Sequence, residues 1–294
     1  MSSRRALLLV LAVAVAAALS AALLVRDESD SATETQFGTT VRVRGGESDA
    51  SAVERLHREV GTPPIVRLFS STLPAPWPRL TDIAGSADIV VSFKIAPSEV
   101  LAGAADTYLR EWFASAPTDR DIYWVYFHEP EDDIERGAFS AREYSRASDR
   151  IARIAATADN PRLINTVVLM CWTVGGDTQR RVASYLAAEP PDVLAWDCYN
   201  AAARDGEYAS PDSLFKESVA ASKRVGAKWA IAEFGSPLVG HDDGDRRARW
   251  LHAVAAYAEQ HQAEFVTYFN STVGGDFELT DQPSQQAWRA IMAG

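Results

Sequence analysis

Two glutamates, each at the end of an apolar run, are the residues of this sequence best placed to do chemistry. Glu129 stands between His128 and Pro130, and Glu233 lies two residues before Gly235. Proline cannot continue a strand and glycine permits a sharp turn, so both glutamates are expected where a strand ends. Cleavage of a glycosidic bond needs two carboxyl groups, one that protonates the leaving oxygen and one that attacks the anomeric carbon.

The elements that must position these glutamates follow one rhythm along the chain. Eight short apolar runs rich in Val and Ile alternate with longer stretches of helical period. The predicted strands are 39–43, 65–69, 89–93, 123–127, 163–170, 193–198, 229–234 and 265–269, and the predicted helices are 50–60, 79–83, 99–114, 141–158, 179–187, 212–225, 245–260 and 284–291.

This alternation predicts an α/β fold, a single-domain (β/α)₈ TIM barrel over residues 37–294. A doubly wound open sheet is the rival, but the turn at 44–47 does not match the G-x-G-x-x-G pattern that usually follows the first strand of such a sheet. Strands four and seven, which carry Glu129 and Glu233, lie on opposite sides of an eight-stranded ring. The two carboxyl groups are therefore expected to face each other at the carboxyl ends of the strands.

The first 36 residues predict export. Arg4 and Arg5 precede a nearly unbroken apolar run over 6–25, which predicts that residues 1–26 are a signal peptide or a membrane anchor. Residues 27–36 are polar and predict a linker. The positive-inside rule places the barrel outside the cytoplasm, either extracellular or membrane-anchored.

Composition narrows the possible partners. The chain carries 40 acidic and 29 basic residues, a net charge of −11, which disfavours nucleic acid as a ligand. The five histidines are scattered and no nucleotide-binding or serine-hydrolase motif occurs, so neither a metal nor a cofactor is expected, and the protein is predicted to be a monomer. Cys171 and Cys198 follow neighbouring strands; export makes a disulfide possible, but bridges between adjacent parallel strands are geometrically awkward, so two free thiols are the favoured prediction.

The pair of strand-end glutamates resembles the large clan of retaining glycoside hydrolases with (β/α)₈ barrels. Within that clan, a His directly before the first Glu, as in His128-Glu129, is similar to glycoside hydrolase family 26, the β-mannanase type. The resemblance implies that Glu129 is the general acid/base, that Glu233 is the nucleophile, and that Tyr199, which ends the sixth strand, lies near the nucleophile. Retention of configuration would place the two carboxyl groups about 5–5.5 Å apart.

Several further residues are candidates for holding a sugar. Arg67 is a charged residue inside a predicted barrel strand and is expected to pair with Glu233. The alternative is an ion pair with a structural role only. Trp172 and Trp77 are expected to stack on sugar faces, although aromatic residues of barrels are often only core. The candidate substrate-binding residues are His128, Tyr199, Trp172, Lys94, Arg67 and Trp77.

Acidic residues near the predicted site are given other roles. The run 131–133 lacks the alternating spacing of a calcium loop and predicts a solvated acidic loop. Asp197 is expected to be a hydrogen-bond acceptor behind the site rather than a catalytic group.

The sequence therefore predicts an exported retaining β-glycosidase that acts on a β-mannan-like or related polysaccharide or oligosaccharide. A non-catalytic carbohydrate-binding or wall-associated barrel is the main alternative, and a barrel hydrolase of another class is a weaker one. The mannanase pattern differs here before the His and after the last strand, where Tyr126-Phe127 and Tyr268-Phe269-Asn270 stand. Linkage and endo or exo mode stay open.

Overall fold

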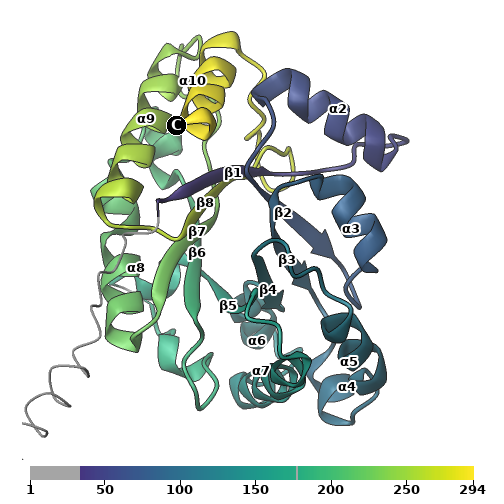
Figure 1. The fold of residues 1–294 in the computed structure, drawn as a ribbon. Coiled ribbons are helices and arrows are strands. Elements are labelled where there is room, and N and C mark those ends of the chain that lie inside the picture. The colour runs from purple at the N-terminus through teal and green to yellow at the C-terminus, as the bar shows by residue number, and fades with distance from the viewer. Residues whose placement is uncertain (1–33, 177) are drawn as a thin grey trace, which may run out of the picture. The chain divides into compact units, whose positions relative to one another are not determined.

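A computed structural model describes residues 34–176 and 178–294, and the predicted signal or anchor segment lies outside these residues. Eight parallel strands close into a barrel in chain order, with each strand paired to the next and β8 paired to β1 (Figure 1). The strands are β1 (Gln36–Thr40), β2 (Ile65–Ser70), β3 (Asp88–Phe93), β4 (Ile122–Tyr126), β5 (Leu163–Met170), β6 (Val193–Tyr199), β7 (Lys228–Gly235) and β8 (Phe265–Tyr268).

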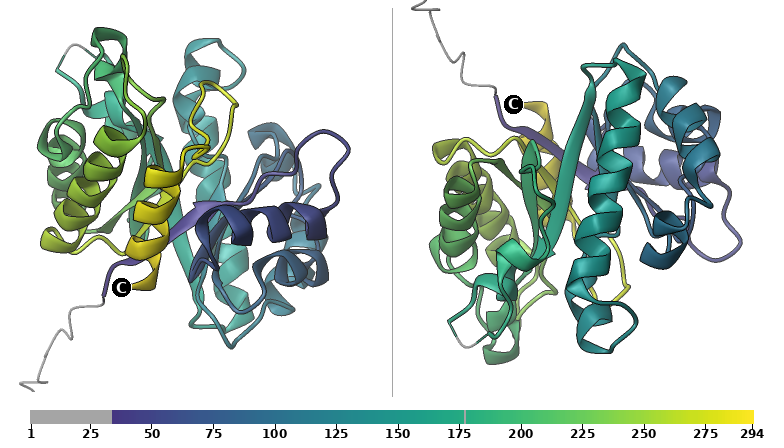
Figure 2. Two further views of the ribbon diagram at one scale, coloured as in Figure 1. Left: turned by 90° about the horizontal axis from the view of Figure 1, so that it is seen from above. Right: turned by 90° about the horizontal axis from the view of Figure 1, so that it is seen from below.

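Helices surround this barrel, as Figure 2 shows from above and below. They are α2 (Asp49–Val60), α3 (Trp77–Ala84), α4 (Pro97–Leu101), α5 (Asp106–Ala114), α6 (Pro130–Glu135), α7 (Ala141–Ala155), α8 (Pro211–Val225), α9 (Asp245–Gln260) and α10 (Gln282–Ala293). The (β/α)₈ TIM barrel predicted from the sequence is confirmed. No helix among the described residues is long and apolar enough to cross a membrane.

Alternation along each strand sorts side chains between two cores. Val66 and Leu68 of β2 belong to the large outer core between strands and helices, whereas Ile65 belongs to the small core inside the barrel. At the floor of the barrel, the end where the strands begin, the Tyr123 ring packs edge-on against Phe265 with centroids 4.7 Å apart. This packed floor leaves the other end of the barrel free to carry polar groups.

Three local predictions were wrong. The predicted helix 179–187 is absent apart from a short 3₁₀ turn, η3 (Val182–Ser184), because Arg180 is tied to α6 through Asp132 and Glu135. The predicted helix 99–114 is two helices, α4 and α5, separated at Gly103, whose φ of 79° does not fit a right-handed helix.

The third correction concerns the first strand. β1 begins three residues before its predicted start, inside the predicted linker, because Gln36 pairs in register with Phe265 of β8. Val43, predicted to end this strand, is instead 46% exposed.

Cys171 and Cys198 form a disulfide, so the prediction of two free thiols was wrong. Cys171 does not lie in the β5 ladder. It opens the 3₁₀ turn η2 (Cys171–Val174), which brings its Cα within 5.2 Å of the Cα of Cys198 in β6. That separation is in the ordinary range for a disulfide, and the awkward geometry of two paired parallel strands does not arise.

Candidate active site

Glu129 is presented by an unusual backbone turn at the end of β4. Both Phe127 and Glu129 have positive φ, 49° and 51°, a left-handed conformation that is uncommon for residues other than glycine. Two hydrogen bonds to neighbouring strands hold the turn: the Phe127 amide donates to the Phe93 carbonyl at 2.8 Å, and the Glu129 amide donates to the Val168 carbonyl at 3.1 Å. Backbone strain of this kind concentrates at functional sites.

Glu233 owes its direction to a β-bulge in β7. In the pairing with β6, Trp196 is opposite Ile231 and Asp197 is opposite Glu233, so one extra residue, Ala232, is accommodated in β7. The pairing with β8 shifts by the same one residue between Ile231 and Phe234.

The bulge decides which way the glutamate faces. Ile231 and Phe234 both pack in the outer core, while Ala230 and Ala232 pack inside the barrel. Strict alternation would send Glu233 outward with Ile231. The extra residue turns it into the barrel instead, as bulges near active sites commonly do.

Two groups hold the Glu233 carboxylate. The Tyr199 hydroxyl donates to Oε2 at 2.6 Å, and the Arg67 guanidinium lies 3.2 Å from Oε1. Arg67 is fully buried and also donates to the Ser92 hydroxyl at 2.7 Å. The predicted ion pair between Arg67 and Glu233 is therefore present, and the prediction that Tyr199 lies beside Glu233 is confirmed.

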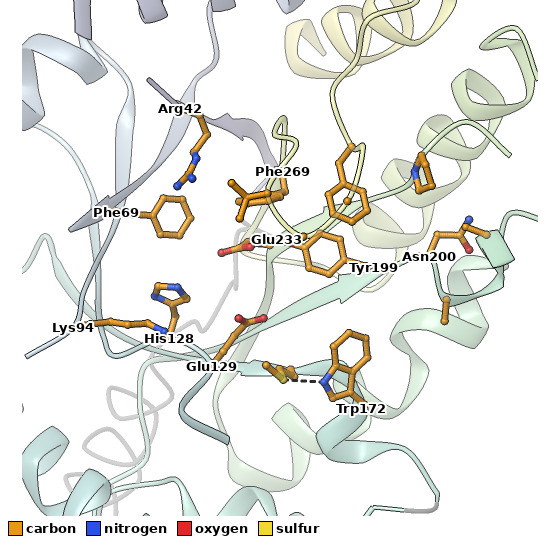
Figure 3. Close-up of a pocket in the computed structure, with 18 of the residues that line it drawn as sticks. Arg42, Phe69, Lys94, His128, Glu129, Trp172, Tyr199, Asn200, Glu233 and Phe269 are labelled. Atoms are coloured by element: carbon orange, nitrogen blue, oxygen red, sulfur yellow. Dashed lines mark hydrogen bonds between the residues drawn. The ribbon is translucent and has the colours of Figure 1, made fainter. Parts of the chain in front are cut away.

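Glu129 has a different electrostatic environment. Burial is the main cause that raises the pKa of Glu129, to about 8, and the neighbouring carboxyl groups of Glu233 and Glu131 raise it further, while Lys94 and Arg67 act in the opposite direction. A carboxyl group with such a pKa is mostly protonated at pH 7. The site thus holds a carboxylic acid opposite a carboxylate that pairs with an arginine (Figure 3).

Both glutamates line one cavity of about 970 Å³ at the carboxyl ends of the strands. Its walls include aromatic rings, with Phe69 and Phe269 near one another at 6.4 Å between centroids, and the Tyr199 ring stacked on Phe277 at 4.6 Å. A cavity of this size and lining suits a sugar, because pyranose rings present apolar faces to aromatic side chains.

Most of the predicted binding residues reach this cavity. His128, Lys94, Tyr199 and Trp172 line it, and the Trp172 indole is 47% exposed at its edge. Trp77 does not reach it. Its ring lies in α3, stacks on Trp112 at 4.3 Å and donates a hydrogen bond to the Trp112 carbonyl, so it packs between helices rather than against a ligand.

His128 is neutral in this setting. Burial lowers the pKa of His128 well below its usual value, and the nearby cations Lys94, Arg67 and Arg42 lower it further. Its ring lies edge-on to Phe69 at 5.3 Å, and Nδ1 has no protein partner. A neutral imidazole can exchange hydrogen bonds with sugar hydroxyl groups.

Two acidic residues differ from their predictions. Glu131, placed by sequence in a solvated loop, is fully buried at the start of α6, where it accepts hydrogen bonds from the Met170 amide and the Thr173 hydroxyl. Pro130 begins this helix, a position at which proline is favoured. Glu131 thereby anchors the segment that carries Trp172.

Asp197 was expected to accept a hydrogen bond, yet neither of its carboxyl oxygens has a partner among the described residues. Its side chain is fully buried. Burial, followed by the charges of Glu233 and Glu129, raises the pKa of Asp197 well above its usual value, which favours the protonated form of this group.

Sequence reasoning missed Arg42, Phe69 and Phe269 as cavity residues. Phe69 is the penultimate residue of β2 and Phe269 directly follows β8, so their places near strand ends were the available signal. Arg42 was harder to find, because it lies two residues beyond β1. Among the described residues, no group of three or more His, Cys, Asp or Glu side chains is placed to hold a metal ion.

Solved structures of similar fold include glycoside hydrolases. The family 26 β-mannanase of Bacteroides ovatus aligns at a TM-score of 0.55 and 13% identity, with 88% of each chain covered. An endo-β-1,4-mannanase of the same family from Cellulomonas fimi aligns at 0.56 and 14%, over 90% of this chain and 71% of that one. A glucosidase from Croceicoccus marinus aligns at 0.61 and 16%, over 89% of this chain and 66% of that one.

This chain shares the (β/α)₈ barrel of these enzymes. At identities this low the likeness shows the fold alone, and the chain spans only about two thirds of the glucosidase. No protein-family model matches the sequence, and no curated protein matches it. The resemblance to the retaining clan, with family 26 among its members, is confirmed at the level of the structure.

Proposed function

We propose that this protein is a retaining β-glycosidase that hydrolyses a β-linked polysaccharide by double displacement. The observation that carries the proposal is the pair of unlike carboxyl groups in one cavity: Glu233, held by Arg67 and Tyr199, and Glu129, whose pKa is raised to about 8. An acid and a nucleophile are the two groups that glycoside hydrolysis with retention requires.

In the first step, Glu233 attacks the anomeric carbon while Glu129 gives its proton to the departing glycosidic oxygen. The products are a glycosyl ester on Glu233 and a free leaving-group hydroxyl. In the second step, Glu129, now a carboxylate, takes a proton from water as the water oxygen attacks the same carbon and releases Glu233. Esterification removes the negative charge of Glu233, and with it one cause of the high pKa of Glu129, which favours the base form.

Product stereochemistry tests the mechanism. Proton NMR of the first product is expected to show the same anomer as the substrate, and an inverted product contradicts double displacement. A 2-deoxy-2-fluoro glycoside is expected to label Glu233. A label on another residue would reassign the nucleophile.

The role of Glu129 is tested with leaving groups. Glu129→Ala should lower turnover of unactivated substrates by about 10²–10⁴-fold and activated aryl glycosides far less, since an activated leaving group needs little protonation. Azide should restore turnover of activated substrates, because it attacks the intermediate without a base. Equal loss on all substrates without rescue contradicts the assignment.

The pH profile gives an independent check. Activity requires protonated Glu129 in the first step, so kcat/KM should fall as the pH rises through about 8. The Glu129→Ala variant should lack this basic limb on activated substrates. A basic limb that survives the substitution would belong to another group.

The substrate class follows from the neighbours and the cavity. Similar folds include enzymes named as mannanases, a mannosidase and an endoglucanase, and we infer a β-mannan or β-glucan backbone as the substrate class. The alternative, a barrel that only binds carbohydrate, predicts equal glycan affinity for wild type and Glu129→Gln with no release of reducing ends from either.

Export is a separate proposal. It rests on Arg4, Arg5 and the apolar run that follows them. Protease added to intact cells should degrade the barrel domain, and a barrel protected until the cells are lysed contradicts export.

A further inference from the structure

Two cations on one wall of the cavity make no ion pair. Arg42 follows β1 and Lys94 follows β3, and both line the cavity. Among the described residues, neither side chain has a carboxylate or hydrogen-bond partner; their polar ends lie over aromatic rings, Arg42 5.8 Å from the Phe69 centroid and Lys94 4.8 Å from that of Phe127. Figure 3 shows both reaching toward the side of the cavity formed by Phe69 and His128.

A shortage of carboxylates does not explain this. The protein has 40 acidic and only 29 basic residues. Nearby arginines of the same barrel end are paired: Arg44 with Glu278 at 2.8 Å, and Arg55 with Glu47 at 3.0 Å. Arg42 and Lys94 differ from these two arginines, because neither makes an ion pair and both line the cavity.

Balancing the catalytic carboxyl groups does not explain them either. Glu233 already has Arg67, whose guanidinium lies 3.2 Å away. The proposed acid Glu129 must remain protonated, and a cation beside it works against that requirement. Lys94 lowers the pKa of Glu129, so this cation opposes the proposed chemistry unless something else uses it.

Substrate binding changes their solvation. A sugar that fills the cavity displaces water from both cations, and an unpaired charge removed from water is costly. A neutral glycan offers only hydroxyl groups in exchange. An anionic group on the sugar would instead gain two charge-assisted contacts, and Phe69 lies beside Arg42 as an apolar surface for the ring itself.

We propose that the glycan acted on here carries an oxyanion, a carboxylate or a sulfate, on a sugar unit that binds against Phe69 between Arg42 and Lys94. This inference rests on the proposed glycosidase function and specifies its substrate class.

The test uses one polymer in three forms of matched length: glucomannan, glucomannan oxidised at C6 to uronates, and O-sulfated glucomannan. Wild-type kcat/KM on one of the charged forms should exceed that on the neutral form by about tenfold or more at low ionic strength. The advantage should shrink in high salt, since exposed charge interactions are screened. The form that wins distinguishes a carboxylate from a sulfate, and a preference for the neutral form overturns the inference.

Charge-removing variants locate the preference. Arg42→Gln and Lys94→Gln should each lower kcat/KM on the preferred charged polymer about tenfold, a larger loss than on the neutral polymer. Arg110→Gln, which removes an exposed charge from the outer helix α5, is the matched control and should keep the preference. Equal losses on all three polymers, together with a displaced basic limb of the pH profile, would mean that the cations only balance the carboxyl groups.

Binding separates this inference from the proposed reaction. Affinity electrophoresis of Glu129→Gln in gels that contain each polymer needs no turnover. Tighter binding of a charged polymer, lost in Glu129→Gln combined with Arg42→Gln, supports the anionic ligand even if no glycan is hydrolysed. Equal retardation by all three polymers overturns it even if hydrolysis is found.

Discussion

The floor and the mouth of the barrel are made by the same eight strands but from opposite kinds of side chain. At the floor, inward side chains such as Ile65, Tyr123 and Phe265 are apolar and contact one another. At the mouth, the inward positions of the same sheet carry charge, among them Arg67 of β2 and Glu233 of β7. The apolar floor stabilises the fold. The charged groups at the mouth are arranged for chemistry and lower that stability.

Buried polar atoms without a protein partner occur in several parts of the described structure. Those of Arg67, His128, Glu131 and Asp197 lie at or beside the mouth, whereas those of Gln36, Asn165 and Trp288 lie elsewhere. Native interiors normally pair such atoms, and at the mouth the four residues belong to the candidate site or lie beside it.

The largest expected effect is at the mouth. Glu233→Gln should lower kcat/KM by on the order of 10⁴-fold or more, because the amide cannot act as the nucleophile, while the fold is retained. The matched control is Glu264→Gln at the floor, where Glu264 contacts Lys228 and Tyr123. Reducing-end assays measure the activity of both variants, and circular dichroism measures their folding. A comparable activity loss in Glu264→Gln would contradict the assignment of activity to the mouth alone.

The reverse pattern is expected at the floor. Phe265→Ala should lower the free energy of unfolding by about 3–5 kcal/mol. The ring of Phe265 is fully buried and packed on Tyr123, and its removal leaves a cavity. kcat of the protein that remains folded should change little. Urea unfolding and an active-site titration separate the two quantities, and a low kcat in fully folded protein would show that floor and mouth are coupled.

The disulfide is expected to have intermediate effects on both activity and stability. Cys171 and Cys198 close a loop with a sequence separation of 27, so replacing both with alanine should cost about 3 kcal/mol. Because Cys171 precedes Trp172, a rise in KM larger than any fall in kcat is also expected. Denaturation of the wild type with and without reductant measures the loss of stability. Equal stability under the two conditions contradicts this prediction.

The smallest effect is a gain in stability. The pKa of Asp197 is raised in the folded protein, so as the pH rises above about 4 the unfolded chain loses this proton first and the folded state is increasingly disfavoured. Asp197→Asn removes that penalty and should raise Tm more at pH 8 than at pH 4, with each kcal/mol corresponding to about 2–4 °C. A Tm difference that does not depend on pH contradicts a protonated Asp197.

Alternation of apolar runs and helical stretches was enough to predict the barrel. Gly235 ends β7, and Pro130 begins the helix that follows β4, so both residues correctly indicated that the glutamates lie near strand ends. The direction of Glu233 was not predictable in the same way, because a period of two in β7 places it outward and only the extra residue at Ala232 reverses it. The disulfide depended on a turn after β5 that no local pattern announces. Burial of Glu131 depended on contacts with Met170 and Thr173, forty residues along the chain.

The bulge in β7 also limits how this site can be transferred to another scaffold. A designer who copies Glu233 into a regular barrel strand at the matching pleat would deliver the carboxylate to the helical shell, not to the lumen. The transferable unit is a one-residue insertion together with the glutamate, and the insertion must be accepted by the strands on both sides, as β6 and β8 accept it here. In a regular strand, a point substitution to glutamate at this position would therefore place the carboxylate outside the lumen.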